Sequence, residues 1–413
     1  MNVEPPNDST LYRGGRVFDG ERMRDGYAVL VEGARIGRVA PEGEFDGFAG
    51  ATVDCEGGTV MPGLIDCHVH LLFRGEPDPM TALEKLDTAH AVVRALENAG
   101  RTLRGGTTSV RDCGGREYQE FAVRDACNEG RFPGPTIRAA GKMICMTGGH
   151  GNRMGRVADG VEEVLKAVRE QIHAGSDLVK IMATGGVMTP GVDPEDAHYS
   201  AEEMAVGIAE ATRFRRTTAS HAQGSEGILN ATRGGVTSIE HGIFMNDECC
   251  AEMVERGTFL VPTLAALRNI LDHAEEGIPD YVVEKARRCA QAHERSVRMF
   301  HEAGGRIALG TDAGTPFNLH GSNADELRFM VEVGLSNLDA LRAGTRNAAD
   351  LMRLDDRGRI ADGAAADLLV VDGDPSADIA AAADRERHRL VVKDGAAVDG
   401  AGSGPEVRER LPA

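Results

Sequence analysis

Two histidines separated by one residue, His68 and His70, end the apolar run at residues 60–70. Residues two apart on a β-strand share a face, so both imidazoles are expected on the same side of that strand. Neutral imidazole is the commonest side-chain metal ligand. A single histidine beside a strand is more often a packing or surface residue, but two at this spacing favour a metal site.

Lys180 lies in the middle of a second apolar run, Asp-Leu-Val-Lys-Ile-Met. An unpaired ammonium is costly to bury, so this lysine must be paired, neutralised or modified. One interpretation is a lysine at a strand end whose charged tip reaches water. The other is a deprotonated Lys180 that has reacted with carbon dioxide, because the resulting carbamate could bridge two metal ions.

Three further candidates end later apolar runs. His221 follows Thr-Ala-Ser, His241 follows Ser-Ile-Glu, and Asp312 follows Ala-Leu-Gly-Thr. Each alone has an ordinary explanation, such as a carboxylate that caps the next helix. Together the six candidates are His68, His70, Lys180, His221, His241 and Asp312. Nitrogen and oxygen donors without a thiolate suit Zn²⁺, with Mn²⁺, Co²⁺ or Fe²⁺ as substitutes.

The elements that carry these residues alternate between short apolar runs and longer helical patterns. The eight runs are 60–70, 107–112, 135–141, 177–183, 217–222, 237–242, 258–264 and 306–314. Helical patterns between them include 81–98, 161–173, 201–213 and 281–301, and Ser200 with Glu203 predicts a capping box. This alternation predicts an α/β fold, a (β/α)₈ TIM barrel. A doubly wound open sheet alternates in the same way, but it would gather polar residues at one switch point rather than after five different strands.

Both ends of the chain differ from the middle. Residues 10–60 and 360–400 alternate apolar and polar side chains between glycine turns, which is typical of antiparallel strands. We expect them to pair into a small discontinuous β-sandwich domain formed by both chain ends. The predicted division is 1–60 for the first part of the sandwich, 61–358 for the barrel and 359–413 for the second part of the sandwich.

Composition narrows the classes of function. The 413 residues carry a net charge of −19, which argues against nucleic acid and anionic membrane surfaces as partners. The first residues lack the pattern of a secretory signal, and no apolar stretch reaches the length of a membrane span. The eight cysteines form no CxxC pair, so we expect buried free thiols and a cytoplasmic location. We also expect a homo-oligomer.

The chain resembles the amidohydrolase superfamily over nearly its whole length. The resemblance rests on Pro62-Gly-Leu-Ile-Asp-Cys-His-Val-His70, on the segment that begins at Gly344-Thr-Arg-Asn and on the segment that begins at Gly363-Ala-Ala-Ala-Asp. Val-Lys-Ile-Met-Ala-Thr-Gly-Gly and Ser-His-Ala-Gln-Gly are most similar to the imidazolonepropionase-like group, which includes Xaa-Pro dipeptidases and enzymes that hydrolyse N-acyl amino acids.

This resemblance implies the subtype with two zinc ions and an N6-carboxylysine at Lys180. One metal would take His68, His70, Lys180 and Asp312, and the other would take Lys180, His221 and His241. A hydroxide bridging the metals would attack the amide, and Asp312 would accept its proton and deliver it to the leaving amine.

Two more residues are candidates for catalysis or for binding a small-molecule amide substrate. His150, on the glycine-rich segment Met-Thr-Gly-Gly-His-Gly, could stabilise a developing oxyanion or lie on the surface. Tyr199 could hold a substrate carboxylate or anchor the following helix, and His198 beside it could do the same. Arg111 could bind an anion or pair with an aspartate at the barrel rim. The remaining expectations concern His90, His173, His273, His293, His301 and His388, expected to be exposed, and Met143, Met146, Met182 and Met188, expected to fill the core.

The leading hypothesis is a metal-dependent hydrolase that cleaves a dipeptide, of the Xaa-Pro type, or an N-acyl amino acid. The enzymatic alternative is a cyclic-amide hydrolase, imidazolonepropionase-like or hydantoinase-like, or a deaminase. The presence of Lys180 argues against the members of this superfamily that use one metal. A non-catalytic barrel scaffold is the alternative from a different class, and retention of all six candidate ligands argues against it. Specificity is expected in the loops 74–80, 145–158 and 185–199.

Overall fold

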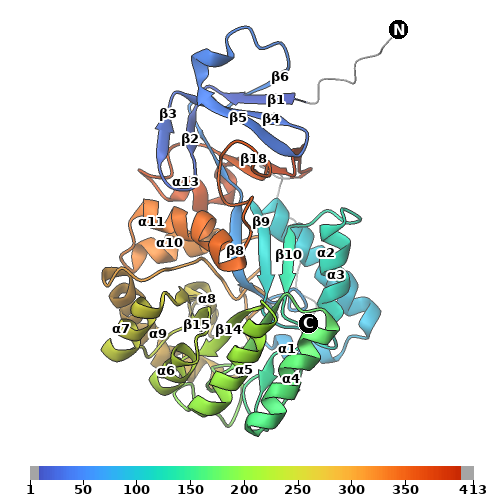
Figure 1. Cartoon of the computed structure of the whole chain (residues 1–413), viewed down its shortest axis with the longest axis vertical. Coiled ribbons are helices and arrows are strands. Elements are labelled where there is room, and N and C mark those ends of the chain that lie inside the picture. Colours follow the sequence, from blue (N-terminus) through green and yellow to red (C-terminus); the bar gives the residue numbers. More distant parts are fainter. Residues whose placement is uncertain (1–8, 401–413) are drawn as a thin grey trace.

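Parallel strands alternate with helices through the middle of the chain in the computed structural model, which describes residues 9–400 (Figure 1). Seven of the eight predicted runs contain such a strand. These strands are β8 (Leu64–Val69), β9 (Thr107–Asp112), β10 (Thr136–Ala139), β13 (Leu178–Met182), β14 (Thr217–Ala222), β15 (Ser238–His241) and β16 (Phe259–Val261). They form one sheet in the order β10-β9-β8 and another that includes β13-β14-β15-β16, extended at β13 by the two-residue strands β11 (Ile144–Cys145) and β12 (Arg156–Val157).

The eighth predicted run, 306–314, lies between β16 and β8. Within the described chain it forms two isolated parallel bridges, Leu260 with Ile307 and Val69 with Ala313, instead of a continuous strand. The Asp312 amide donates to the carbonyl of His68 at 2.7 Å. Gly310 explains the close approach, because a Cβ at this position would lie 2.3 Å from Cγ1 of Val261.

Helices follow most of the parallel strands. They are α1 (Pro79–Glu84), α2 (Thr88–Arg104), α3 (Gln119–Asn128), α4 (Gly160–Ala174), α5 (Ala201–Arg213), α6 (Ser225–Arg233), α7 (Asp247–Arg256), α8 (Leu264–Asp272), α9 (Asp280–Glu302), α10 (Asp325–Glu332), α11 (Asn337–Arg342) and α12 (Ala348–Met352). The capping box of Ser200 and Glu203 at α5 is confirmed. The predicted helix 81–98 is instead two helices, because the Asp87 side chain accepts from the His90 amide and begins α2 there.

Strands from the two chain ends lie together at one end of the molecule (Figure 1). One sheet has the order β5-β4-β1-β6 and the other has the order β19-β18-β17-β7-β2-β3. Their strands are β1 (Ser9–Arg13), β2 (Arg16–Phe18), β3 (Met23–Asp25), β4 (Tyr27–Glu32), β5 (Arg35–Pro41), β6 (Ala51–Asp54), β7 (Thr59–Pro62), β17 (Leu368–Val371), β18 (His388–Lys393) and β19 (Ala396–Ala397). β7 pairs antiparallel with β17, so the two ends of the chain meet in one sheet.

Gly63 separates β7 from β8, so the predicted run 60–70 contributes to both parts of the molecule. Its first residues pair with β17 in the terminal sheet, and Leu64–Val69 pair with β9. The chain therefore passes directly from the terminal sheets to the strand that carries the two spaced histidines.

All eight cysteines are buried and have free thiols, which confirms the expectation from their spacing. Among residues 9–400, no helix combines the length and the apolar character needed to cross a bilayer.

Candidate active site

A cavity of about 120 Å³ lies at the carboxyl ends of the parallel strands. Seven of the eight predicted site residues line it: His68, His70, His150, Lys180, His221, His241 and Asp312. The register of the parallel strands explains part of this convergence. His221 of β14 lies level with Glu240 of β15, and Lys180 of β13 lies level with Ala219, two residues before His221.

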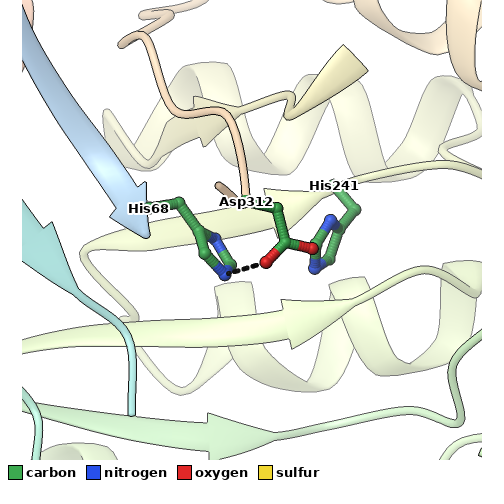
Figure 2. A group of neighbouring side chains, drawn as sticks. All are labelled: His68, His241 and Asp312. Atoms are coloured by element: carbon green, nitrogen blue, oxygen red, sulfur yellow. Dashed lines mark ion pairs between the residues drawn. The ribbon is translucent and has the colours of Figure 1, made fainter. Parts of the chain in front are cut away.

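Four of the lining imidazoles form a continuous chain. The ring centroids are 5.4 Å apart for His68 and His70, 5.2 Å for His68 and His241, and 4.6 Å for His221 and His241. Asp312 faces two of these rings, with Oδ1 at 3.5 Å from Nε2 of His68 and 3.3 Å from Nε2 of His70. Figure 2 shows His68, Asp312 and His241 converging from three separate elements, with potential ligand atoms within 4.8 Å of one another.

Each of these four histidines has one ring nitrogen held by the surrounding protein. Nδ1 of His68 is 2.8 Å from a Glu240 carboxylate oxygen, and Nδ1 of His241 is 2.7 Å from the Thr263 hydroxyl. Main-chain carbonyls hold the other two rings, at 2.9 Å in both cases. Such contacts fix the tautomer and orientation of metal-binding histidines, and they leave the opposite nitrogen of each ring available to a ligand.

Burial keeps most of these imidazoles neutral. Together with the nearby Lys180, it holds the pKa of His68 well below its ordinary value, and burial lowers the pKa of His241 to about 3. Burial would raise the pKa of Asp312, but its interactions with the adjacent imidazoles of His68 and His70 outweigh burial and hold that pKa well below the usual range. Neutral imidazoles and an ionised carboxylate are the protonation states that bind metal ions.

Lys180 is 1% exposed, and within residues 9–400 its Nζ has no hydrogen-bond partner. Burying an unsatisfied ammonium carries a large desolvation penalty. The donor set and this isolated Nζ therefore fit a site that holds divalent metal and a modified lysine.

The backbone around the site is strained at three points. His241, Thr263 and Asp312 have φ values of 71°, 55° and 62°, in the left-handed region that side chains rarely adopt. Conformations of this kind cost roughly 1–3 kcal/mol each and cluster at functional sites. At His241 the departure from strand geometry lets two consecutive residues, Glu240 and His241, both contact His68.

His150 lies beside the four-histidine chain, with its ring centroid 4.4 Å from that of His221. Its Nδ1 is 2.7 Å from the hydroxyl of Thr189, which belongs to the loop after β13. Lys285 of α9 holds this loop, because its ammonium donates to the carbonyls of Thr189 at 2.7 Å and Val192 at 2.6 Å. Arg288 adds a salt bridge to Asp193 of the same loop.

Tyr199 does not reach the cavity. It is 2% exposed, and its hydroxyl donates to the carbonyl of Ala158 at 2.8 Å, so the alternative of an anchoring aromatic fits its position better than substrate binding. His198 is also buried and is absent from the cavity lining. The phenol of Tyr199 therefore points toward the residues just before α4, and its ring belongs to the main hydrophobic core.

Arg111 of β9 supports the site from within the parallel strands, through Glu240. It is 1% exposed, and it donates to Oε1 of Glu240 at 2.8 Å while Oε2 of the same carboxylate holds His68. Arg111 thus pairs with a buried glutamate, Glu240, and not with an aspartate at the rim as expected. The sequence analysis missed Glu240, because strict alternation along a strand would point it away from the face of His241.

Two expectations about histidines are wrong. His293 is 2% exposed and lines the cavity from α9, and His388 is 2% exposed at the start of β18. Burial lowers the pKa of His293 to about 4. The helical and strand patterns alone did not reveal that these histidines face inward. His90 and His173 are exposed as predicted, whereas His273 and His301 are half-buried.

The rest of the lining is mainly apolar. Met143 and Met182 belong to a buried core cluster as expected, and both also line the cavity together with Met188. Met146 packs against the core and does not line the cavity. The apolar lining consists of Phe73, Met80, Met143, Met154, Met182, Val187, Met188, Ile243, Ala266, Leu267 and Ile270. The three expected loops each contribute, and α8 adds a wall that the sequence analysis did not anticipate.

Comparison with known proteins agrees with this arrangement. Residues 59–398 match the Amidohydrolase family. The chain is 32% identical to ochratoxinase from Aspergillus niger over 377 residues, covering 84% of this chain and 77% of that protein. A prolidase complexed with N-methylphosphonate-L-proline superposes with a TM-score of 0.87 at 34% identity, covering 94% of this chain and 99% of the other.

A Xaa-Pro dipeptidase with methionine bound in its active site superposes with a TM-score of 0.86 at 31% identity, over 95% of this chain and 100% of the other. These neighbours share a TIM-barrel-type fold with this α/β structure. The family match covers most of the chain, and from it we conclude that this protein is a member of the amidohydrolase family and a hydrolase.

Proposed function

We propose that the protein is a zinc-dependent amidohydrolase that cleaves the amide bond of a dipeptide, of the Xaa-Pro type, or of an N-acyl amino acid. The observation that carries this proposal is the convergence of four imidazoles, Asp312 and the isolated Nζ of Lys180 on one cavity. The names of the similar proteins, ochratoxinase, prolidase and Xaa-Pro dipeptidase, support hydrolysis of amide bonds.

Two divalent ions would be held by residues already in place. His68, His70 and Asp312 would hold one, His221 and His241 the other, and a carboxylated Lys180 would belong to both. Bound metal would polarise the amide carbonyl and lower the pKa of the attacking water.

Asp312 is suited to hold and move a proton during the reaction. Its carboxylate is ionised, faces the cavity and lies within 3.5 Å of two imidazoles. An ionised carboxylate at this position accepts a proton from the attacking water and delivers it to the nitrogen of the leaving amine.

His150 is suited to stabilise negative charge on the substrate oxygen. Burial lowers its pKa to about 3, so its imidazole is neutral. In the tautomer in which Nδ1 accepts from the hydroxyl of Thr189, Nε2 carries the proton and donates to the carbonyl oxygen as charge develops.

The lining supports a substrate with an apolar group next to the scissile amide. Methionines adapt to varied apolar shapes, and five of them line this cavity. Arg153 also lines the cavity, but two of its nitrogens already donate to the carboxylate of Glu84, which compensates its charge.

We also propose that the parallel strands close into a barrel and that the terminal sheets form a β-sandwich. The bridges of residues 306–314 to both β16 and β8 support a closed barrel, and the hydrophobic cluster shared by β4, β5, β7 and β17 supports a β-sandwich made by the chain ends. We retain the cytoplasmic location and the homo-oligomer as parts of the proposal.

The test begins with metal content. Protein purified without chelator is expected to contain about two zinc-like ions per chain and to hydrolyse members of a panel of N-acyl amino acids, Xaa-Pro dipeptides and cyclic amides. His221→Ala should lose metal and activity, whereas the exposed His90→Ala should retain both. Full activity with one ion per chain would contradict the two-metal proposal.

Lys180→Ala tests the bridging lysine. It should lose metal and turnover, and acetate should partly restore both by replacing the missing carboxylate. Normal metal content and normal turnover in this variant would contradict the assignment.

A further inference from the structure

A second cavity, of about 160 Å³, lies at the opposite end of the parallel strands from the candidate active site. It is formed where β13 and β14 begin and where α12 ends. Five arginines line it, Arg111, Arg138, Arg215, Arg216 and Arg353, together with a single carboxylate, Asp177. This concentration of positive charge is unusual in a chain with a net charge of −19.

Ion pairing within the protein accounts for only two of these arginines. Arg111 is paired with Glu240, and Arg138 lies 3.4 Å from Asp177, which it shares with Arg124. Arg215, Arg216 and Arg353 have no carboxylate within 4.0 Å in the part of the chain from residue 9 to residue 400. The Nε of Arg216 is buried there without a hydrogen-bond partner.

Positive charge at helix carboxyl ends does not fully explain the cluster. The helix dipole favours cations there, and NH1 of Arg353 donates to the carbonyl of Arg215 at 3.2 Å, just past the end of α5. A guanidinium has five N–H donors, however, and this contact uses one of them.

The backbone supports a specific role for two of these residues. Arg215 and Arg353 have φ values of 60° and 53°, at positions past helix ends where glycine is usual. Both residues line the cavity, and the guanidinium groups of the five arginines that line it repel one another.

We propose that this cavity is a binding site for a small oxyanion, such as phosphate or a carboxylate. Guanidinium groups match the paired oxygens of such anions through parallel hydrogen bonds. The anion would neutralise the three arginines that have no carboxylate partner. Arg111 lines this cavity and also donates to Glu240, and Glu240 in turn holds His68. The cavity is therefore connected to a candidate metal ligand through two buried side chains.

The experiment measures binding of inorganic phosphate to the full-length, metal-loaded protein by calorimetry and by the shift of Tm. Acetate and chloride at equal ionic strength form the other arms. The variant is Arg215→Gln with Arg216→Gln, and the matched control is Arg213→Gln, an exposed arginine on the same helix end that pairs with Glu210.

We expect phosphate to raise the Tm of wild type and control more than chloride does. The double variant should bind phosphate at least about tenfold more weakly, since it removes two charged hydrogen-bond donors from the cavity. Without oxyanion it should be no less stable than wild type, because like-charge repulsion is removed. A larger response to acetate than to phosphate, lost in the same variant, would identify a carboxylate as the ligand.

Equal phosphate affinity in wild type and the double variant would overturn the proposal, because binding would then occur elsewhere, for example at the metals. A response to phosphate no larger than the response to chloride would overturn it as well. Neither result depends on hydrolytic activity, so the proposed function is tested separately.

Discussion

The imidazole of His68 is supported by two buried charges rather than by one. Glu240 is completely buried and holds Nδ1 of His68, and the equally buried Arg111 neutralises Glu240. Removing one partner of a buried pair is costly, because the other charge is left without compensation. This arrangement couples the orientation of a candidate metal ligand to the interior of the parallel strands.

Glu240→Gln should therefore weaken metal binding in addition to lowering the stability of the fold. We expect an affinity roughly 10–100-fold lower, the usual effect of removing a residue that orients a ligand. Competition with a chromophoric chelator measures it. Glu248→Gln, which removes an exposed carboxylate paired with Arg233, is the control. Unchanged affinity in Glu240→Gln would show that the carboxylate does not orient His68.

Asp312→Asn separates proton transfer from metal binding. The amide oxygen still offers a ligand atom, but the side chain no longer accepts a proton. We expect kcat to fall by about 10²–10⁴, the usual contribution of general acid–base catalysis, with part of the metal retained. Steady-state kinetics and elemental analysis on the same preparation measure both quantities. If kcat is unchanged with both metals bound, another group moves the proton.

At the scale of elements, one wall of the cavity depends on a helix distant in sequence. The loop after β13 contributes Val187, Met188 and Thr189 to the lining, and α9 holds this loop through Lys285 and Arg288. Because Thr189 also contacts Nδ1 of His150, α9 affects the orientation of His150 through this loop.

Lys285→Met should release this loop while preserving the apolar stem of the side chain. Lys285 donates to three main-chain carbonyls, so we expect hydrogen exchange in residues 185–197 to accelerate roughly tenfold or more. KM should rise and kcat should fall as His150 loses its fixed orientation.

Mass-spectrometric hydrogen exchange, read segment by segment, distinguishes this effect from general destabilisation, because exchange in β14 and β15 should not change. Lys166→Met, at a side chain that is 71% exposed, is the matched control. Unaltered exchange in the loop would contradict the role given to Lys285.

At the scale of the whole molecule, a buried carboxyl links folding stability to pH. Glu326 of α10 is completely buried, and its two oxygens accept from the amides of Leu264 and Ala265 at the start of α8. Burial raises its pKa to about 8 from an ordinary value of 4.5. Between these values the folded protein holds a proton that the unfolded chain has released, so this group makes stability fall as pH rises.

Glu326→Gln should remove this contribution. The free energy of unfolding of wild type, relative to the variant, should decrease from pH 5 to pH 8 by up to about 1.4 kcal/mol per pH unit. Urea unfolding of both proteins at several pH values measures the difference. A difference independent of pH would mean that the carboxyl has the same pKa in both states.

Local sequence patterns were sufficient to predict most of the parallel strands and most residues of the candidate site. Short apolar runs separated by helical patterns predicted seven parallel strands correctly, because periodicity and glycine turns are local properties. Seven of the eight residues predicted for the site line the cavity, because most of them lie on parallel strands, whose carboxyl ends point to the same side.

The hydrogen-bond partners of the candidate ligands and the rest of the cavity lining depend on tertiary packing. Tyr199 packs into the core, whereas His293 turns inward from α9, and no local pattern distinguishes the two outcomes. Glu240 and His241, although consecutive, both reach His68 because the left-handed backbone at His241 breaks the alternation of the strand. Contacts of this kind join residues far apart in the chain, so they depend on how β-strands and helices pack and not on the sequence near either residue.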